Sequence, residues 1–155
     1  MECQEIFNKI DALKDQYTQI WEDICNIESP TSCKEGVDAV GRYIMALAEK
    51  KGWQISVSHQ DVSGDAICIT MNGDSKLEPV SISGHIDTVH PIGFFGTPAV
   101  HKDDEKMYGP GVHDCKGGVV VGLLAMDALQ SCGYNKRPVK MLLQSDEETS
   151  FRQCS

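Results

Sequence analysis

The spacing of the apolar residues changes near Gly52, and this change limits the folds open to the chain. Before it, apolar residues recur at steps of three and four and mark one face of a long helix that ends near Glu28, ahead of Pro30. These residues are Ile6, Ile10, Leu13, Tyr17, Ile20, Ile24 and Ile27. A second helical pattern covers residues 34–51. After Gly52 the pattern alternates or forms short β-rich runs, which are typical of strands.

The later elements complete a mixed order of helices and strands. Strands are expected at residues 55–57, 66–71, 79–83 and 139–144, with a helix at about 118–131 and a long ordered loop at 88–113. We therefore predict an α/β fold with three layers, in which helices cover both faces of a sheet. Ligands of such folds bind beyond the carboxyl ends of the strands, and two acidic clusters lie at such ends.

The composition excludes several functions. The 155 residues fit one domain, and the net charge of −9 argues against binding nucleic acid or an anionic membrane, since both need a basic face. No window approaches 18 apolar residues, and the charged N-terminus does not resemble a signal peptide. The seven cysteines form no CxxC pair. We therefore expect reduced thiols and a cytoplasmic location.

Three segments carry side chains that could bind metal. His85 and Asp87 lie two apart in an extended backbone and so share a face, where the carboxylate could orient the imidazole for a metal ion. Asp114 is flanked by glycines that allow a ligand to approach closely, and its carboxylate could bridge two cations. Glu147 and Glu148 follow an apolar strand, where one could bind metal while the other takes a proton from water.

Each segment also has an ordinary interpretation. A histidine in a strand is commonly packed or solvated, an aspartate before a helix commonly caps it, and a run of acidic residues commonly forms a solvated loop. The order of the three segments is much more specific than any one of them.

That order resembles a known family. The segments SGHIDTV (residues 83–89), YGPGVHDCKGG (108–118) and DEE (146–148) are similar to the signature segments of one zinc-dependent family. This exopeptidase and deacylase family includes carboxypeptidase G, acetylornithine deacetylase, succinyl-diaminopimelate desuccinylase and aminoacylase. The resemblance implies the N-terminal part of a phosphorylase/hydrolase-like catalytic domain across residues 1–155, and it implies hydrolysis of amide or peptide bonds.

The resemblance also implies a role for each site residue. His85 would bind one zinc ion, Asp114 would bridge two, and Glu148 would bind the second. Glu147 would be the general base, and Asp87 would orient His85. The family tends to have a cis peptide bond after the bridging aspartate. Cobalt or manganese could replace zinc, because mixed nitrogen and oxygen ligands select weakly among these metals.

The sequence departs from the family by stopping early. Each metal ion has two ligands here, and residues 151–155 add no carboxylate or imidazole. The lid and dimerisation domain is also absent, so a homodimer is expected only of a full-length enzyme. The substrate would be a small peptide or an N-acyl amino acid. The alternatives are a non-catalytic remnant that acts as an interaction partner, or a structural domain with an acidic loop.

Overall fold

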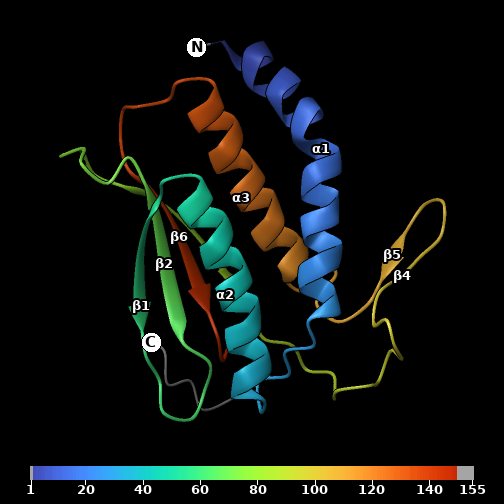
Figure 1. The fold of residues 1–155 in the computed structure, drawn as a ribbon. Coiled ribbons are helices and arrows are strands. Elements are labelled where there is room, and N and C mark those ends of the chain that lie inside the picture. Colours follow the sequence, from blue (N-terminus) through green and yellow to red (C-terminus); the bar gives the residue numbers. More distant parts are fainter. Residues whose placement is uncertain (1, 150–155) are drawn as a thin grey trace.

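A computed structural model describes residues 2–149 of the chain (Figure 1). The elements, in chain order, are α1 (Cys3–Asn26), α2 (Lys34–Lys50), β1 (Gln54–Ser58), β2 (Ala66–Met71), β3 (Val80–His85), β4 (His101–Lys102), β5 (Met107–Tyr108), α3 (Lys116–Ser131) and β6 (Val139–Gln144). The expected helices and main strands are all present, and β6 has the predicted bounds. The expected loop contains the short β4–β5 hairpin. Before this hairpin, the Thr97-Pro98 peptide bond of the loop is cis.

The main sheet has the strand order β1-β2-β6-β3. β2 runs antiparallel to both β1 and β6, whereas β3 runs parallel to β6. The parallel register pairs His85 with Gln144, so β3 and β6 end side by side. The segments that follow these two strands therefore leave the sheet at one edge, which is where ligands of α/β folds bind.

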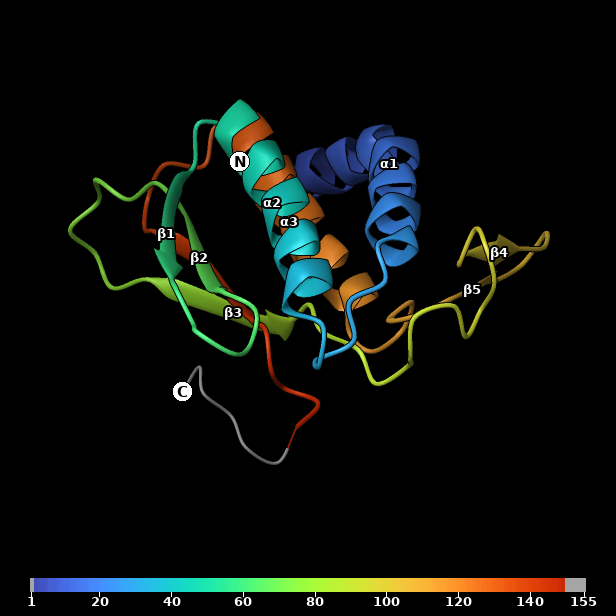
Figure 2. The same cartoon turned by 60° about the horizontal axis from the view of Figure 1, so that its bottom comes forward.

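All three helices lie on the same face of the sheet. Figures 1 and 2 show α2 and α3 next to the strands and α1 packed beside α3. Burial along β6 alternates accordingly: Val139, Met141 and Leu143 are buried, whereas Leu142 is 39% exposed. The α/β class is confirmed. Within residues 2–149, however, the helical cover that we expected on both faces is on one face alone.

A buried polar contact fixes the helices to one another within the apolar core. The hydroxyl of Tyr17 in α1 donates a hydrogen bond to Asp127 of α3 at 2.9 Å, and Lys51 after α2 donates to the same oxygen at 2.5 Å. Burial and the Asp127 carboxylate both raise the pKa of Tyr17, so its hydroxyl keeps its proton at neutral pH. One carboxylate thus links three helices.

None of the helices in residues 2–149 combines the length and the apolar character that a membrane crossing requires.

Met141→Ala tests the importance of the apolar side of β6. Met141 is fully buried in the core, so its truncation should lower the free energy of unfolding by about 2–5 kcal/mol. Leu142→Ala is the matched control on the opposite face and should cost less than about 1 kcal/mol. Urea unfolding measures both values. Equal losses would contradict the one-sided core.

Candidate metal centre

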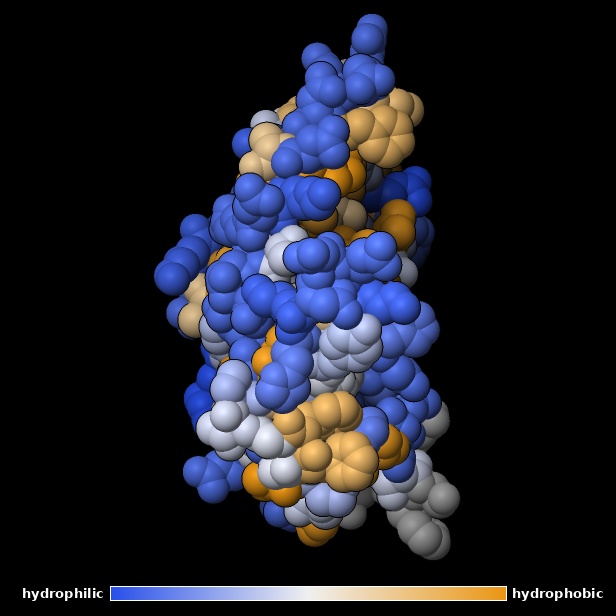
Figure 3. Space-filling model, turned by 90° about the vertical axis from the view of Figure 1, so that its right-hand side faces the viewer, coloured by the Kyte–Doolittle hydropathy of each residue, from blue (hydrophilic) through white to orange (hydrophobic). Residues whose placement is uncertain are grey.

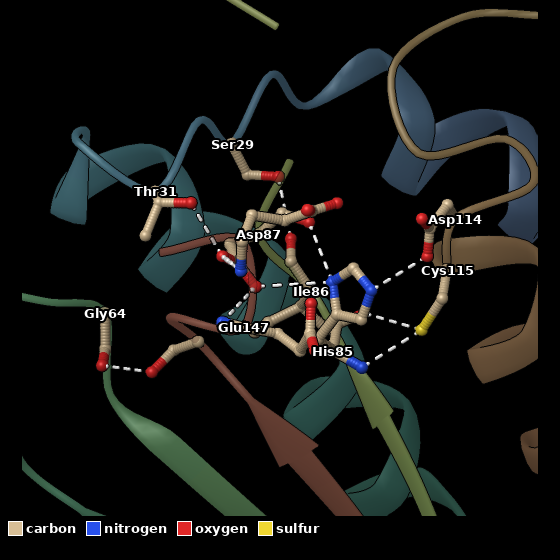
Figure 4. A network of polar contacts seen from close by, with 11 residues as sticks. Ser29, Thr31, Gly64, His85, Ile86, Asp87, Asp114, Cys115 and Glu147 are labelled. Carbon is tan, nitrogen blue, oxygen red and sulfur yellow. Dashed lines mark hydrogen bonds and ion pairs between the residues drawn. The ribbon is translucent and has the colours of Figure 1, made fainter. Parts of the chain in front are cut away.

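The candidate site lies where β3 and β6 end, and the loop before α3 closes it from the side (Figure 4). His85 is the last residue of β3, and Asp87 follows two residues later. Glu147 and Glu148 come three and four residues after the end of β6, and Asp114 comes two residues before α3. Three segments that are distant in sequence therefore place their acidic and imidazole groups together.

His85 is held by a carboxylate on each side of its ring. Its side chain is 8% exposed; Nε2 lies 3.0 Å from Oδ1 of Asp114, and Nδ1 lies 3.3 Å from Oδ1 of Asp87 and 3.1 Å from the Asp87 carbonyl oxygen. Hydrogen bonding to Asp87, followed by the contacts with Cys115 and Asp114, raises the pKa of His85 to about 11 despite burial. A metal ion at Nε2 would therefore replace a proton.

Asp87 is completely buried and accepts several hydrogen bonds. Oδ2 accepts from the hydroxyl of Thr31 at 2.7 Å and from the backbone N–H of Glu148 at 3.1 Å, while Oδ1 accepts from the backbone N–H of Glu147 at 3.2 Å. Burial alone would raise the pKa of Asp87, but these bonds and His85 together lower it. The charged carboxylate thus orients His85 and also fixes the acidic segment.

Asp114 stands on a sharply folded loop with its side chain 73% exposed. The Asp114-Cys115 peptide bond is cis, which confirms the expectation from the family resemblance. Gly111 has a φ of +71°, and a Cβ there would lie 3.0 Å from both Lys116 and Thr88, so glycine allows this close passage. The loop thereby brings the Asp114 carboxylate to the imidazole of His85.

Lys116 anchors this loop to the end of α1. Its side chain is fully buried, and Nζ donates hydrogen bonds to the carbonyl oxygens of Ile24 at 3.0 Å and Ile27 at 2.8 Å. Burial lowers the pKa of Lys116 to about 8. Trp21 adds a second link by donating to the Val112 carbonyl at 3.1 Å. The end of α1 therefore supports the segment that carries Asp114.

Within residues 2–149, the groups that could hold a metal ion form two overlapping sets. One set is His85, Asp114 and Cys115, and the other is His85, Glu147 and Glu148; within each set the ligand atoms lie within 4.8 Å of one another. Burial, together with the negative charges of Asp114, Asp87 and Glu147, raises the pKa of Glu148, although His85 opposes this shift. A cation would reverse that repulsion. The donor set, imidazole with carboxylates, suits zinc and similar ions.

Asp114 and Glu148 face a common hollow of about 240 Å³, which His90 and His113 also line. All five residues predicted from the sequence are thus close together. His85 is central, and both Asp114 and the glutamate pair lie near it.

The sequence did not reveal some supporting residues. The hydroxyl of Thr31 donates a hydrogen bond to Asp87, which lies 56 residues later in the sequence. The hydroxyl of Ser29 donates to the carbonyl oxygen of Ile86 at 2.8 Å. Cys115 contacts the backbone of His85, whose N–H lies 3.1 Å from its sulfur. A Ser-Pro-Thr turn after a helix does not by itself indicate a residue of a functional site. Only the pairing of Pro30 with Thr88 in the folded chain brings this turn to the site.

The ends of β3 and β6 thus carry a histidine between carboxylates, which is a candidate metal centre in an α/β domain. Comparisons with known proteins specify it further. Residues 81–153 match the model of "Peptidase family M20/M25/M40". Carboxypeptidase G2 of Pseudomonas sp. (strain RS-16) is 31% identical over 130 residues, which cover 82% of this chain and 31% of that protein.

Solved structures share the fold at lower identity. Human carnosine dipeptidase 1 superposes with a TM-score of 0.78 at 18% identity, and the di-peptidase Dug1p of Saccharomyces cerevisiae with 0.77 at 20%. Each match covers 94% of this chain and 35% of the other chain. Residues 81–153 are thus similar to Peptidase family M20/M25/M40, and the chain spans about a third of the length of these relatives.

The raised pKa of His85 predicts how zinc binding depends on pH. Because the imidazole holds its proton up to a pKa of about 11, each bound zinc ion must displace it, and apparent affinity should rise about tenfold per pH unit. Titration of the chain with zinc between pH 6.5 and 8.5 measures this slope. His85→Asn should weaken binding and flatten the slope, while the exposed His59→Asn should change neither. Affinity that levels off above pH 7 would contradict the shifted pKa.

Proposed function

We propose that this chain forms part of a metal-dependent hydrolase that cleaves amide or peptide bonds at a two-zinc site. The observation that carries the proposal is the convergence of His85, Asp114 and the glutamate pair on one end of the sheet, with Asp87 buried beneath them. The similarity of residues 81–153 to a peptidase family supports this chemistry.

The residues would divide the work as follows. His85 and Asp114 would hold one zinc ion, and Asp114 and Glu148 the other. When bound, the metal pair would lower the pKa of a shared water and polarise the scissile carbonyl. Glu147 would accept the proton of that water and deliver it to the departing amine. Asp87 would fix the ring of His85 through Nδ1, leaving Nε2 for the metal.

The remaining ligands would come from parts of a longer protein. Zinc sites usually use about three protein ligands per catalytic ion, and two per ion are identified here. We accordingly propose that residues 1–155 are the N-terminal part of the catalytic domain. The relatives, about three times as long, have room for a lid and for a dimer interface.

Because each proposed zinc ion has two of its ligands in this chain, calorimetry of the 155-residue chain should detect weak zinc binding, and assays should detect no turnover.

The proposed substrates are small peptides or N-acyl amino acids. Similarity to carboxypeptidase G2 favours release of a C-terminal amino acid from such a compound.

We also propose a cytoplasmic location for the enzyme. The support is the set of free thiols at Cys3, Cys25, Cys33, Cys68, Cys115 and Cys132.

Paired substitutions at the two glutamates test the proposed roles. In the longer enzyme, Glu147→Gln should lower kcat at least about 100-fold, because the general base is lost, while zinc content stays nearly unchanged. Glu148→Gln should instead release zinc. Metal analysis of the purified variants, alongside hydrolysis of N-acyl amino acids and dipeptides, separates the two effects. If Glu147→Gln loses the metal and Glu148→Gln retains it, the assigned roles are exchanged.

A further inference from the structure

The thiol of Cys115 lies at the metal centre but has no part in the proposed hydrolysis. Together with His85 and Asp114 it forms one set of potential ligands, in which the ligand atoms lie within 4.8 Å of one another. Figure 4 shows the sulfur and the Asp114 carboxylate on the same side of the imidazole. No other cysteine within residues 2–149 belongs to such a set, so Cys115 differs from the other described thiols.

The spacing within this set suits a single ion. Ligands of a zinc-like ion lie about 2.0–2.3 Å from it, so any two of them are at most about 4.6 Å apart. The observed limit of 4.8 Å is only slightly larger, and Nε2 of His85 already lies 3.0 Å from the Asp114 carboxylate. Small side-chain rotations would therefore bring the imidazole, the carboxylate and the sulfur around one ion.

Two contacts with the backbone of His85 fix the direction of the Cys115 side chain. The backbone N–H of His85 donates to the sulfur at 3.1 Å, and the thiol donates to the carbonyl oxygen of His85 at 3.4 Å. A metal ion would replace the thiol proton and leave the N–H bond to the sulfur in place. Partners of this kind hold a ligand in the orientation that a metal ion needs.

The set is open to an incoming ion on one side. Cys115 is partly exposed, and the side chain of Asp114 is 73% exposed. Asp114 also lines the hollow of about 240 Å³, from which a bound ion could take water as its fourth ligand. On the other side of the ring, Asp87 holds His85 through Nδ1. The imidazole is thus fixed, while Nε2 remains accessible.

The sulfur changes which metal ions the set prefers. Imidazole and carboxylate groups bind many divalent ions, whereas a thiolate is a soft ligand that selects thiophilic ions. The overlapping set of His85, Glu147 and Glu148 contains no sulfur and lacks this preference. Cadmium, which is more thiophilic than zinc, should therefore favour the set that contains Cys115.

We infer that His85, Asp114 and Cys115 form a binding site for a thiophilic metal ion such as Cd²⁺. The ion bonds to Nε2, to a carboxylate oxygen and to the sulfur. The protons of the thiol and of Nε2 pass to the solvent, and no group is oxidised or reduced. Because His85 and Asp114 are also the proposed ligands of the first zinc ion, a thiophilic ion excludes that zinc ion. This exclusion rests on the proposed function, whereas the site itself does not.

Cadmium titration of the reduced 155-residue chain tests the site. A thiolate bound to Cd²⁺ absorbs ultraviolet light by charge transfer, so the absorption band reports the sulfur directly. The chain should develop this band and should bind cadmium more tightly than zinc. Cys115→Ser should remove the band and weaken cadmium binding at least about 100-fold, since even partners outside a ligand set typically contribute about 10–100-fold.

Two further variants complete the test. Cys68→Ser is the matched control, because Cys68 is another partly exposed thiol, in β2, and lies outside the set; band and affinity should both be retained. Asp114→Asn changes an exposed side chain, so the fold should be unaffected. It should keep the band but weaken cadmium binding at least about tenfold, because one ligand is impaired.

A band that persists in Cys115→Ser would overturn the inference, because other thiols would then hold the cadmium. Unchanged affinity in Asp114→Asn would also overturn it, since Cys115 would then bind the ion alone. Failure of the proposed function is recognised separately. If zinc binds at His85 but cadmium gives no band, the inference alone fails. If the band forms as expected while Glu147→Gln in the longer enzyme retains full hydrolysis, the assigned hydrolase roles alone fail.

Discussion

Asp87 is a carboxylate with no exposed surface, and its two oxygens connect three segments of the chain. His85 before it, Thr31 in the turn after α1 and the backbone of Glu147 and Glu148 after β6 all bond to it. A charge buried this deeply is stable only if its bonds compensate for lost hydration. The positions of the imidazole and the glutamate pair therefore depend on one another through Asp87.

The rest of the fold serves this arrangement. The parallel pairing of β3 with β6 ends both strands together, which brings Asp87 within reach of the acidic segment. On the other side, Lys116 ties the Asp114 loop to the last carbonyls of α1. Helix α1 thus contributes twice, since the turn that follows it supplies Thr31.

Figure 3, which views the molecule from the side of α1 and the β4–β5 hairpin, shows a mostly hydrophilic surface with separate apolar patches. Phe7 and Phe94 are among the exposed apolar residues of the chain.

Much of the fold could be predicted from the sequence because local pattern determines it. The helical spacing before Gly52 and the apolar run at residues 139–144 gave α1, α2 and β6 within a few residues. The strand order and the placing of all helices on one face could not be predicted, because they depend on contacts between distant segments. The five candidate site residues were identifiable because their spacing is specific. Thr31 was not, since a lone hydroxyl residue is common and only tertiary packing brings it to Asp87.

Anomalous diffraction at the zinc edge from crystals of the zinc-soaked chain tests the central claim most directly. The account predicts an ion about 2.0–2.2 Å from Nε2 of His85 and from a carboxylate oxygen of Asp114, with Nδ1 still at Asp87. An ion held by other residues, or one bound to His85 through Nδ1 with Asp87 displaced, would contradict it.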